Sequence, residues 1–475
     1  MRTAQDRPGH RNYFIMEINN RSDSELNSQP NVPLSYTVRR GTGPLYWSAY
    51  EYPFLHNKAI PEERWRRNID WVAAEFSPFG YRMVCTDGWI ENSTRTNANG
   101  YILSHDDSWA HGWGYWVDYC RSKGLALGVY YNPLWVAPSA VADPSKRVAG
   151  TDIPVSGIVD AEYRFPGENH GQTGDRFAYT QGGGALYWAD VEKPGAKEYV
   201  QGYVRYFRDM GIQFLRVDFL SWYEDGMDKG RMVGRSHGTE NYRTALDWIC
   251  EAAGGRMDIS LVMPHLKNNG ESELHRGQLA RIDEDCGTGG WENFSDRDRG
   301  RHFDRWSQFS NAFDGLVYWS RYLPQAGMIP DADMLRLNTF ADDEERKSAV
   351  SLCLAAGAPV DIGDQFDTIG GSAWIYRNPE MLELNRRGFR GAPLSADPRS
   401  PLSQTWVGKM GDASWIAAFF NREKEPELRG IDFQAVLGIP KGSVRDLWEH
   451  QDLGKMDRFS KILSPHSCTV LKIAP

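Results

Sequence analysis

The sequence has few of the residues from which metal sites and disulfide frameworks are built. Its six cysteines are scattered and none forms a C-x-x-C pair, so neither a structural zinc site nor a disulfide framework is expected. Histidine is scarce, with 11 in 475 residues and no H-E-x-x-H motif. We therefore expect no metal and no cofactor, and a metal-dependent hydrolase is a weak alternative.

Long apolar and long basic runs are missing as well. Nowhere do 18 apolar residues stand together, so no membrane-spanning segment is expected. The formal net charge is −9, which disfavours nucleic acid as a partner. The start, MRTAQDRPGHRNYF, has no apolar core of a secretory signal. The missing signal favours a cytoplasmic protein, or a periplasmic or secreted one if a signal was removed. Whether the protein forms a homo-oligomer stays open.

Aromatic side chains are what the sequence has in excess. They make up 13% of the chain, with 18 Trp and 22 Tyr. Such rings either fill a core or hold sugar rings by stacking, and composition alone does not decide between the two. Hydrophobic residues at 41% and charged residues at 25% are ordinary for globular proteins, and the length predicts one large domain and a smaller one.

The order of apolar and polar segments predicts three parts. Residues 1–34 are rich in Asn, Ser and Pro and are expected to form an extended N-terminal leader. Residues 35–388 alternate strand-like apolar runs with amphipathic helical patterns, such as 63–76, 114–124 and 195–211. Eight such units predict an α/β fold, a (β/α)8 TIM barrel. A doubly wound sheet is the alternative, but no G-x-G-x-x-G follows the first expected strand.

The eight expected strands begin near residues 44, 81, 125, 212, 258, 279, 314 and 357, and the seventh is read as DGLVYWS. Residues 389–475 have a different pattern, with short runs such as SWIAAFFN and HSCTVLKIAP between turns. This pattern predicts a small C-terminal antiparallel β-sandwich domain.

Polar side chains recur where the expected strands end. They include Asp87, Tyr130, Arg216, Asp218, His265, Arg281, Asp283, Asp285, Asp331, Asp333, Asp361 and Asp364. A single carboxylate at such a place is often a helix cap or an ion pair, and 283–285 alone could be a solvated acidic turn. In a barrel, however, the active site lies at the carboxyl ends of the strands, and repetition at many strands favours a site.

Two carboxylates at such a mouth suggest glycoside hydrolysis, with one as nucleophile and the other as acid and then base. The nucleophile must stay ionised, and Arg216, two residues from Asp218 on the same face, is expected to lower the pKa of Asp218. The acid must keep its proton, and the neighbouring carboxylates of 283–285 are expected to raise one another's pKa.

Several stretches resemble the α-galactosidase group, glycoside hydrolase family 27 and its clan relatives in family 36. CTDGW (85–89) resembles the family's D-D-G/C-W, and FLRVDF (214–219) resembles the strand that carries its nucleophile. ARIDEDCGTGGW (280–291) is similar to its acid/base stretch, and IPDADML (329–335) to W-N-D-P-D-M-L. SKGLALGVYYNP (122–133), the helix before GAPVDIGD and VRDLWEHQDLG (444–454) also match, in order, over roughly residues 40 to 475.

The resemblance implies a retaining exo-glycosidase that removes terminal α-D-galactose-like residues by double displacement. Asp218 would be the nucleophile and Asp285 the acid/base, with Asp283 as the fallback. Arg281 would contact the sugar near its 2-hydroxyl, and Asp87 would bind the hydroxyls around C4 and C6. The other residues expected to bind the carbohydrate substrate are Trp47, Tyr130, Arg216 and Asp333.

Two departures from the family pattern concern the substrate. Thr86 stands where the family has an aspartate, and Arg216 where it has a lysine, and these cations are not interchangeable at a hydrogen-bonded site. Lost acceptors for a sugar hydroxyl alter specificity strongly. Galactose-like sugars, β-L-arabinopyranosides and α-glucosides or α-glucan therefore stay open. A non-catalytic carbohydrate-binding barrel is a further alternative, countered by the presence of both aspartates.

Overall fold

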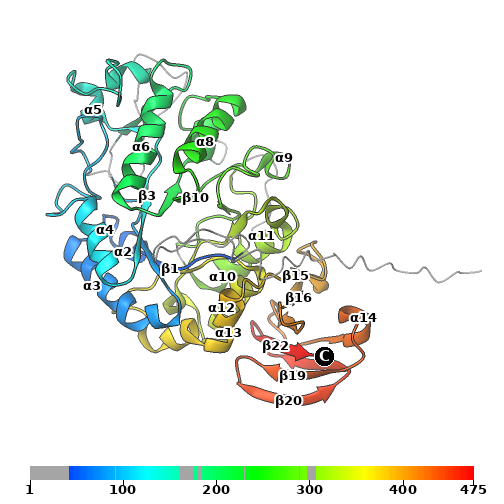
Figure 1. The fold of residues 1–475 in the computed structure, drawn as a ribbon. Helices are drawn as coiled ribbons and strands as arrows, with labels where there is room; N and C mark the ends of the chain where they lie inside the picture. The colour runs from blue at the N-terminus through cyan, green and yellow to red at the C-terminus, as the bar shows by residue number, and fades with distance from the viewer. Residues whose placement is uncertain are drawn as a thin grey trace, which may run out of the picture.

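The computed structural model describes residues 42–90, 93–160, 176–178, 185–228, 231–287, 289–296 and 306–475, so the leader expected at 1–34 lies outside the described residues. A parallel sheet in the order β12-β11-β10-β7-β3-β2-β1-β14-β13 forms the centre of the fold (Figure 1). Its strands are β1 (Leu45–Ser48), β2 (Met83–Cys85), β3 (Ala126–Tyr130), β7 (Phe214–Val217), β10 (Asp258–Leu261), β11 (Leu279–Arg281), β12 (Ile329–Asp331), β13 (Met334–Leu335) and β14 (Val360–Ile362).

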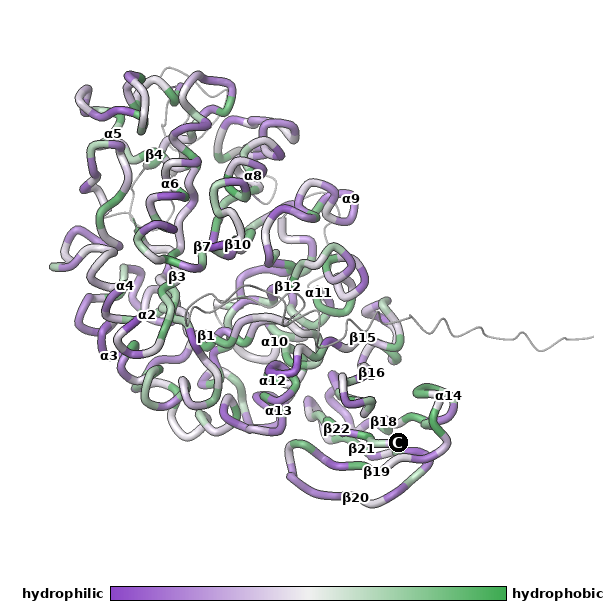
Figure 2. Tube along the Cα trace, in the orientation of Figure 1, coloured by the Kyte–Doolittle hydropathy of each residue, from purple (hydrophilic) through white to green (hydrophobic). Residues whose placement is uncertain are grey.

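Helices follow the strands and form the outer layer of the barrel. The longer ones are α3 (Glu62–Glu75), α4 (Trp113–Ser122), α6 (Ala196–Met210), α8 (Thr239–Ala253), α11 (Ala312–Trp319), α12 (Asp343–Ala356) and α13 (Pro379–Arg386). The short ones are α2 (Glu51–His56), α5 (Pro138–Ala142), α7 (Leu220–Asp225), α9 (Lys267–Gly270) and α10 (Gly290–Ser295). In Figure 2 the stretch of β3 is hydrophobic, whereas the outer turns of α3 and α13 are mostly hydrophilic. The predicted TIM barrel is confirmed.

The local sequence explains where α6 begins and ends. Gly195 and Gly211 flank the helix, and both have a positive φ that glycine adopts at little cost. Between them, Tyr199, Tyr203 and Phe207 recur at intervals of four and are fully buried. This spacing places the rings on one helix face, against the sheet. The prediction of a helix over 195–211 is confirmed.

The seventh strand position is where the sequence prediction is wrong. DGLVYWS is not a strand but part of the buried helix α11, whose N-cap Asn311 accepts a hydrogen bond from the backbone N–H of Asp314. An apolar run this short does not separate a buried strand from a buried helix. The seventh strand is instead β12 followed by β13, which pair with β11 and β14 and so close the barrel. Asp333 stands between β12 and β13 with a φ of 66°.

The inside of the barrel has an apolar floor and a polar layer above it. Tyr46, Met83, Cys85, Ala126, Phe214, Leu279 and Ile329 form the buried floor cluster. Because side chains alternate along a strand, the next inward positions on β7, β11 and β12 are Arg216, Arg281 and Asp331. The carboxyl ends of the strands therefore carry charged groups in a buried setting.

Residues after α13 form two antiparallel sheets. The larger runs in the order β15 (Ala392–Pro393), β16 (Thr405–Lys409), β17 (Trp415–Phe420), β22 (Cys468–Ala474), β19 (Gly442–Asp446) and β20 (Gln451–Met456). The smaller pairs β18 (Glu427–Asp432) with β21 (Arg458–Leu463), and the helix α14 (Phe433–Leu437) follows β18. The predicted C-terminal β-sandwich is confirmed. A domain boundary at residue 389 stays a prediction.

A buried arginine joins the C-terminal sheets to the barrel. Arg422, after β17, lies 2.6 Å from the Asp314 carboxylate of α11 and donates to the Ser295 carbonyl at 2.7 Å. Its guanidinium also lies over the Phe313 ring, 4.2 Å from the centroid. Both ions of the pair are shielded from water, so each depends on the other for compensation of its lost hydration.

Replacing Arg422 by Met is expected to lower the free energy of unfolding by about 3 to 5 kcal/mol, because Asp314 would stay buried without its cation. Urea unfolding followed by tryptophan fluorescence measures the fall in the midpoint. Arg458→Met is the control, since Arg458 is 72% exposed in its pair with Asp457. Equal midpoints for the two variants would contradict the assignment of Arg422 as a domain anchor.

Candidate active site at the carboxyl ends of the barrel strands

Asp218 follows β7 directly and is held by three groups. One carboxylate oxygen accepts the hydroxyl of Tyr130 at 2.6 Å, and the other accepts the backbone N–H of Phe219 at 2.5 Å. The Asn132 amide donates to the Asp218 carbonyl at 2.7 Å. Burial raises the pKa of Asp218 to about 6, although the Tyr130 hydroxyl, the Phe219 N–H and Arg281 act in the opposite direction. The carboxylate is therefore ionised only above mildly acidic pH.

The sequence predicted that Arg216 keeps Asp218 ionised, and the structure does not agree with this prediction. Its guanidinium donates to the Tyr46 hydroxyl at 2.9 Å and pairs with Asp361 at 3.4 Å and Asp333 at 3.7 Å. No ion pair joins Arg216 to Asp218 in the described part of the chain. The reason is topological, because β14 and the β12–β13 break bring their carboxylates to the centre of the barrel beside Arg216. Arg216 thus belongs to the polar layer below Asp218.

Arg281, at the end of β11, connects two further carboxylates. Its guanidinium lies 3.0 Å from Asp333 and 3.1 Å from Asp285. Asp333 also accepts the backbone N–H of Cys286 at 2.8 Å, which fixes the segment that carries Asp285. The left-handed conformation of Asp333 is what turns its carboxylate toward Arg281 and Cys286. The structure thus brings Asp218, Arg281, Asp285 and Asp333 into one electrostatic group.

The two acid/base candidates differ in their access to solvent. Asp283 is fully buried, and burial together with Asp333 and Asp331 raises its pKa well above the ordinary value. The Asp285 side chain is 60% exposed at the mouth. Desolvation by the surrounding protein, which this exposure moderates, and the nearby Asp333 and Glu284 raise the pKa of Asp285 against the effect of Arg281. Of the two, Asp285 is the one that a substrate in solution can reach.

Asp87 lies at the end of β2, where the sequence predicted it. One of its oxygens accepts the backbone N–H of Trp89 at 2.8 Å and lies 3.2 Å from Nε2 of His105. Its other oxygen is buried and has no hydrogen-bond partner among the described residues. Thr86 faces the neighbouring strand instead, and its hydroxyl accepts the N–H of Tyr130 at 3.0 Å. Asp87 therefore offers one acceptor, and Thr86 joins β2 to β3.

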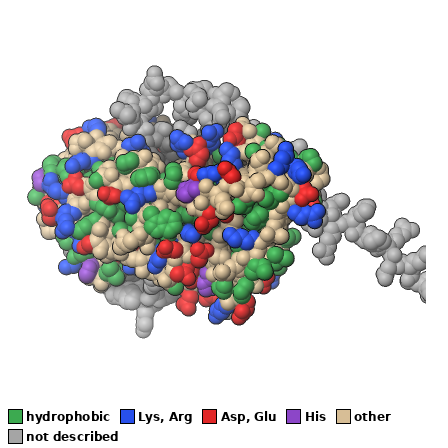
Figure 3. All heavy atoms as spheres, turned by 90° about the horizontal axis from the view of Figure 1, so that it is seen from below, with side chains coloured by type: hydrophobic (Ala, Val, Ile, Leu, Met, Phe, Trp, Pro, Cys, Tyr) green, Lys and Arg blue, Asp and Glu red, His purple; other side chains and the backbone are tan. Residues whose placement is uncertain are grey.

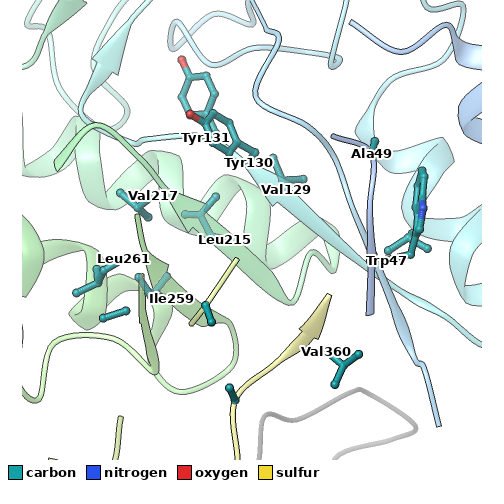
Figure 4. Packing of buried hydrophobic residues seen from close by; sticks show 14 of the residues in the cluster. Trp47, Ala49, Val129, Tyr130, Tyr131, Leu215, Val217, Ile259, Leu261 and Val360 are labelled. Atoms are coloured by element: carbon teal, nitrogen blue, oxygen red, sulfur yellow. The ribbon is translucent and has the colours of Figure 1, made fainter. Parts of the chain in front are cut away.

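Trp47 is not brought to this group. Its ring is fully buried and packs against Trp65 of α3 at 5.6 Å, while its indole N–H donates to the Asp364 carbonyl. Figure 4 shows the indole pointing away from Tyr130, toward the helix layer. Inward and outward positions alternate on β1, so Trp47 faces outward because Tyr46 faces inward. The predicted place of Trp47 in the pocket does not agree with this orientation.

The comparisons with known proteins agree with this fold. Isomalto-dextranase from Arthrobacter globiformis is 47% identical over 452 residues, which cover 93% of this chain and 68% of that protein. The solved structure of that enzyme with panose superposes with a TM-score of 0.85 at 47% identity, covering 92% of this chain and 73% of the other. A family described as alpha galactosidase C-terminal beta sandwich domain matches residues 401–473.

A second solved structure, of a GH27 β-L-arabinopyranosidase from Geobacillus stearothermophilus, has a TM-score of 0.70 at 18% identity and covers 92% of this chain and 97% of its own. Alpha-galactosidase 3 from Arabidopsis thaliana is 26% identical over 181 residues, 36% of this chain and 41% of that protein. The chain belongs to glycoside hydrolase family 27. The family resemblance noted in the sequence is thereby confirmed, and the protein is a glycoside hydrolase.

Sequence reasoning missed two aromatic rings of this family 27 site. Tyr50 precedes α2, and its ring lies 6.1 Å from the ring of Tyr130, while the Arg216 guanidinium lies 5.5 Å from its centroid. Trp306 lies below Arg281, whose guanidinium is 5.7 Å from the ring. The sequence held no signal for Trp306. Tyr50 lies beyond the end of β1, at the N-cap of α2, so the alternation of the strand gave no signal for it.

The outer surface agrees with the charge of the sequence. Seen from below in Figure 3, acidic, basic and hydrophobic side chains are interspersed, and no basic patch gathers on that face. Within the described ranges, none of the helices combines the length and the apolar character that crossing a membrane requires.

Proposed function

We propose that this family 27 enzyme hydrolyses an α-glucan of the dextran type with retention of anomeric configuration. The observation that carries the proposal is the 47% identity to isomalto-dextranase over 93% of the chain. The α-galactosidase match covers only 36% of the chain at 26% identity, so the galactose-like substrate first expected from the motifs is not supported to the same extent. The α-glucan alternative becomes the leading hypothesis.

The geometry supports the proposed catalytic roles. Asp218 is the nucleophile, because it is fixed by Tyr130 and Phe219 at the end of a barrel strand. Asp285 is the acid and then the base, because it is exposed at the mouth and has a raised pKa. Arg281 forms ion pairs with Asp285 and Asp333 and thereby orients both carboxylates. The family resemblance assigns Asp87 to the sugar hydroxyls, and its second carboxylate oxygen has no hydrogen-bond partner among the described residues.

The substrate is tested with a panel that contains dextran, isomaltotriose, and aryl α-galactoside, α-glucoside and β-L-arabinopyranoside. We expect hydrolysis of dextran and isomaltotriose to exceed that of the galactoside and the arabinopyranoside by orders of magnitude in kcat/KM. Proton NMR of the first product identifies its anomer, and an initial α product supports retention. Preferential hydrolysis of the α-galactoside would overturn the proposed substrate.

Removing the Tyr130 hydroxyl is expected to move the acid limb of kcat/KM to higher pH. In the wild type the limb should lie near pH 6, because Asp218 has a pKa of about 6 and must be ionised to attack. Tyr130→Phe removes a hydrogen bond that favours the ionised form, so the pKa of Asp218 rises by about 1 to 2 units. Activity at pH 6 therefore falls. The measurement is kcat/KM from about pH 4 to 8.

Tyr131→Phe is the matched control for this experiment. Tyr131 is the next residue on the chain and is fully buried, but its hydroxyl interacts with Tyr203 of α6 and is not among the groups that shift the pKa of Asp218. Its removal should leave the acid limb in place. A limb that stays fixed in Tyr130→Phe, or moves to lower pH, would show that another group controls this part of the profile.

A further inference from the structure

Phe54 of α2 is a large hydrophobic ring that stays 38% exposed beside the catalytic group. Its ring meets Trp89 edge to face at a centroid distance of 5.3 Å and lies 6.1 Å from Tyr50. Tyr50 in turn contacts Tyr130, whose hydroxyl holds Asp218. A continuous series of rings thus leads from the nucleophile to Phe54 at the surface.

Phe54 also abuts the segment that carries Asp285. A Cβ atom on Gly287, two residues after Asp285, would lie only 2.4 Å from the Phe54 ring. Glycine lets the backbone approach the ring here, and a larger residue would require the ring to move. The Phe54 ring thus contacts Trp89, from the segment of Asp87, and lies close to Gly287, from the segment of Asp285.

The helix that carries Phe54 is fixed from below by a buried carboxylate. Glu51 is fully buried in the first turn of α2, directly after Tyr50. It accepts hydrogen bonds from Asn338 at 2.5 Å and Gln365 at 3.1 Å, and it also contacts Arg336 and Thr368. These partners come from the segments after β13 and β14. The platform is thus held in one position before a ligand arrives, which reduces the entropic cost of binding.

We propose that Phe54 is the platform of a second glucosyl subsite, which binds the unit of the α-glucan next to the one held by Asp218 and Asp285. The ligand class rests on the proposed function. A pyranose ring presents an apolar C–H face, and an exposed aromatic ring that is rigidly supported offers such a face a large contact area. Trp89 and Gly287 border the platform on either side. The glucosyl unit next to the catalytic one would therefore lie against the Phe54 ring.

The test compares two substrates that differ in how many sugar units they present. Isomaltotriose occupies both subsites, whereas α-glucosyl fluoride has one sugar and a leaving group of a single atom. In Phe54→Ala, the ratio of kcat/KM for isomaltotriose to that for α-glucosyl fluoride is expected to fall about tenfold or more, as for the loss of an aromatic binding anchor. Phe54→Tyr, which keeps the ring, should restore the ratio.

Phe79→Ala is the matched control, because Phe79 is 37% exposed but packs against Arg377, in the short helical turn Ser77–Phe79. Its ratio should equal that of the wild type. An unchanged ratio in Phe54→Ala, or an equal loss on both substrates, would overturn the subsite. If the wild type does not hydrolyse isomaltotriose, the proposed function fails instead, so the two failures are distinguishable.

Discussion

Asp218→Asn is expected to lower kcat on dextran by about 10⁴-fold or more, while the variant stays folded and binds substrate. The amide cannot attack the anomeric carbon, yet it keeps the volume of the carboxylate and can still accept the Tyr130 hydroxyl. The pKa of Asp218 is raised by burial, so removing its charge should not destabilise the fold. The measurements are kcat on dextran, binding of isomaltotriose by calorimetry, and the thermal unfolding midpoint.

Azide separates the role of a nucleophile from that of a structural carboxylate. In Asp218→Ala, azide enters the space of the carboxylate and attacks the anomeric carbon of an α-glucoside as the leaving group departs. This single displacement inverts the configuration and yields the β-glucosyl azide. An Asp218→Asn variant with near wild-type kcat, or an Asp218→Ala variant from which azide gives only the α product, would contradict the assignment of Asp218 as nucleophile.

The sequence predicted most of the barrel because its local signals agree with one another. The helices over 63–76 and 195–211 have amphipathic patterns long enough to identify, and the flanking glycines mark the ends of α6. The seventh strand was misread because its residues are split by Asp333, so neither β12 nor β13 alone is long enough to show a strand pattern. The apolar helix α11 took its place in the prediction.

The direction in which a site side chain points could be predicted only for residues at strand ends that were clear in the sequence. Asp87, Asp218 and Arg281 follow inward positions on strands whose ends were clear. Tyr46 and Trp47 are adjacent aromatic residues on β1, and a barrel strand is buried on both faces, so polarity could not tell inward from outward. The partners of Arg216 come from strands more than 100 residues away, and no local pattern reports such a contact.

The charge network below the site follows from the departure at Arg216. A guanidinium can donate in several directions within one plane, and Arg216 uses this to reach Tyr46, Asp361 and Asp333 together. Asp333 is then shared between Arg216 and Arg281. Asp333 therefore lies between the cation beneath Asp218 and the arginine that pairs with Asp285.

Asp285→Ala is expected to lower kcat/KM on dextran by about 10³-fold but that on α-glucosyl fluoride by less than about tenfold. A sugar leaves poorly and needs a proton from Asp285, whereas fluoride leaves with little help. The value of kcat on the fluoride should nevertheless fall, because the second step needs Asp285 as the base that activates water. Azide should restore kcat on the fluoride by attacking the glycosyl-enzyme intermediate, and the product should be the α-glucosyl azide.

Asp283→Asn is the matched comparison, because it removes the other acid/base candidate from the same segment. Asp283 is fully buried beside Cys286 and contacts no solvent, so it cannot deliver a proton to a leaving group in the mouth. Its replacement should lower kcat/KM on dextran and on α-glucosyl fluoride by the same factor, because it would displace Arg281 and Cys286, which Asp283 contacts. A loss confined to dextran in Asp283→Asn, with an equal loss on both substrates in Asp285→Ala, would reverse the two assignments.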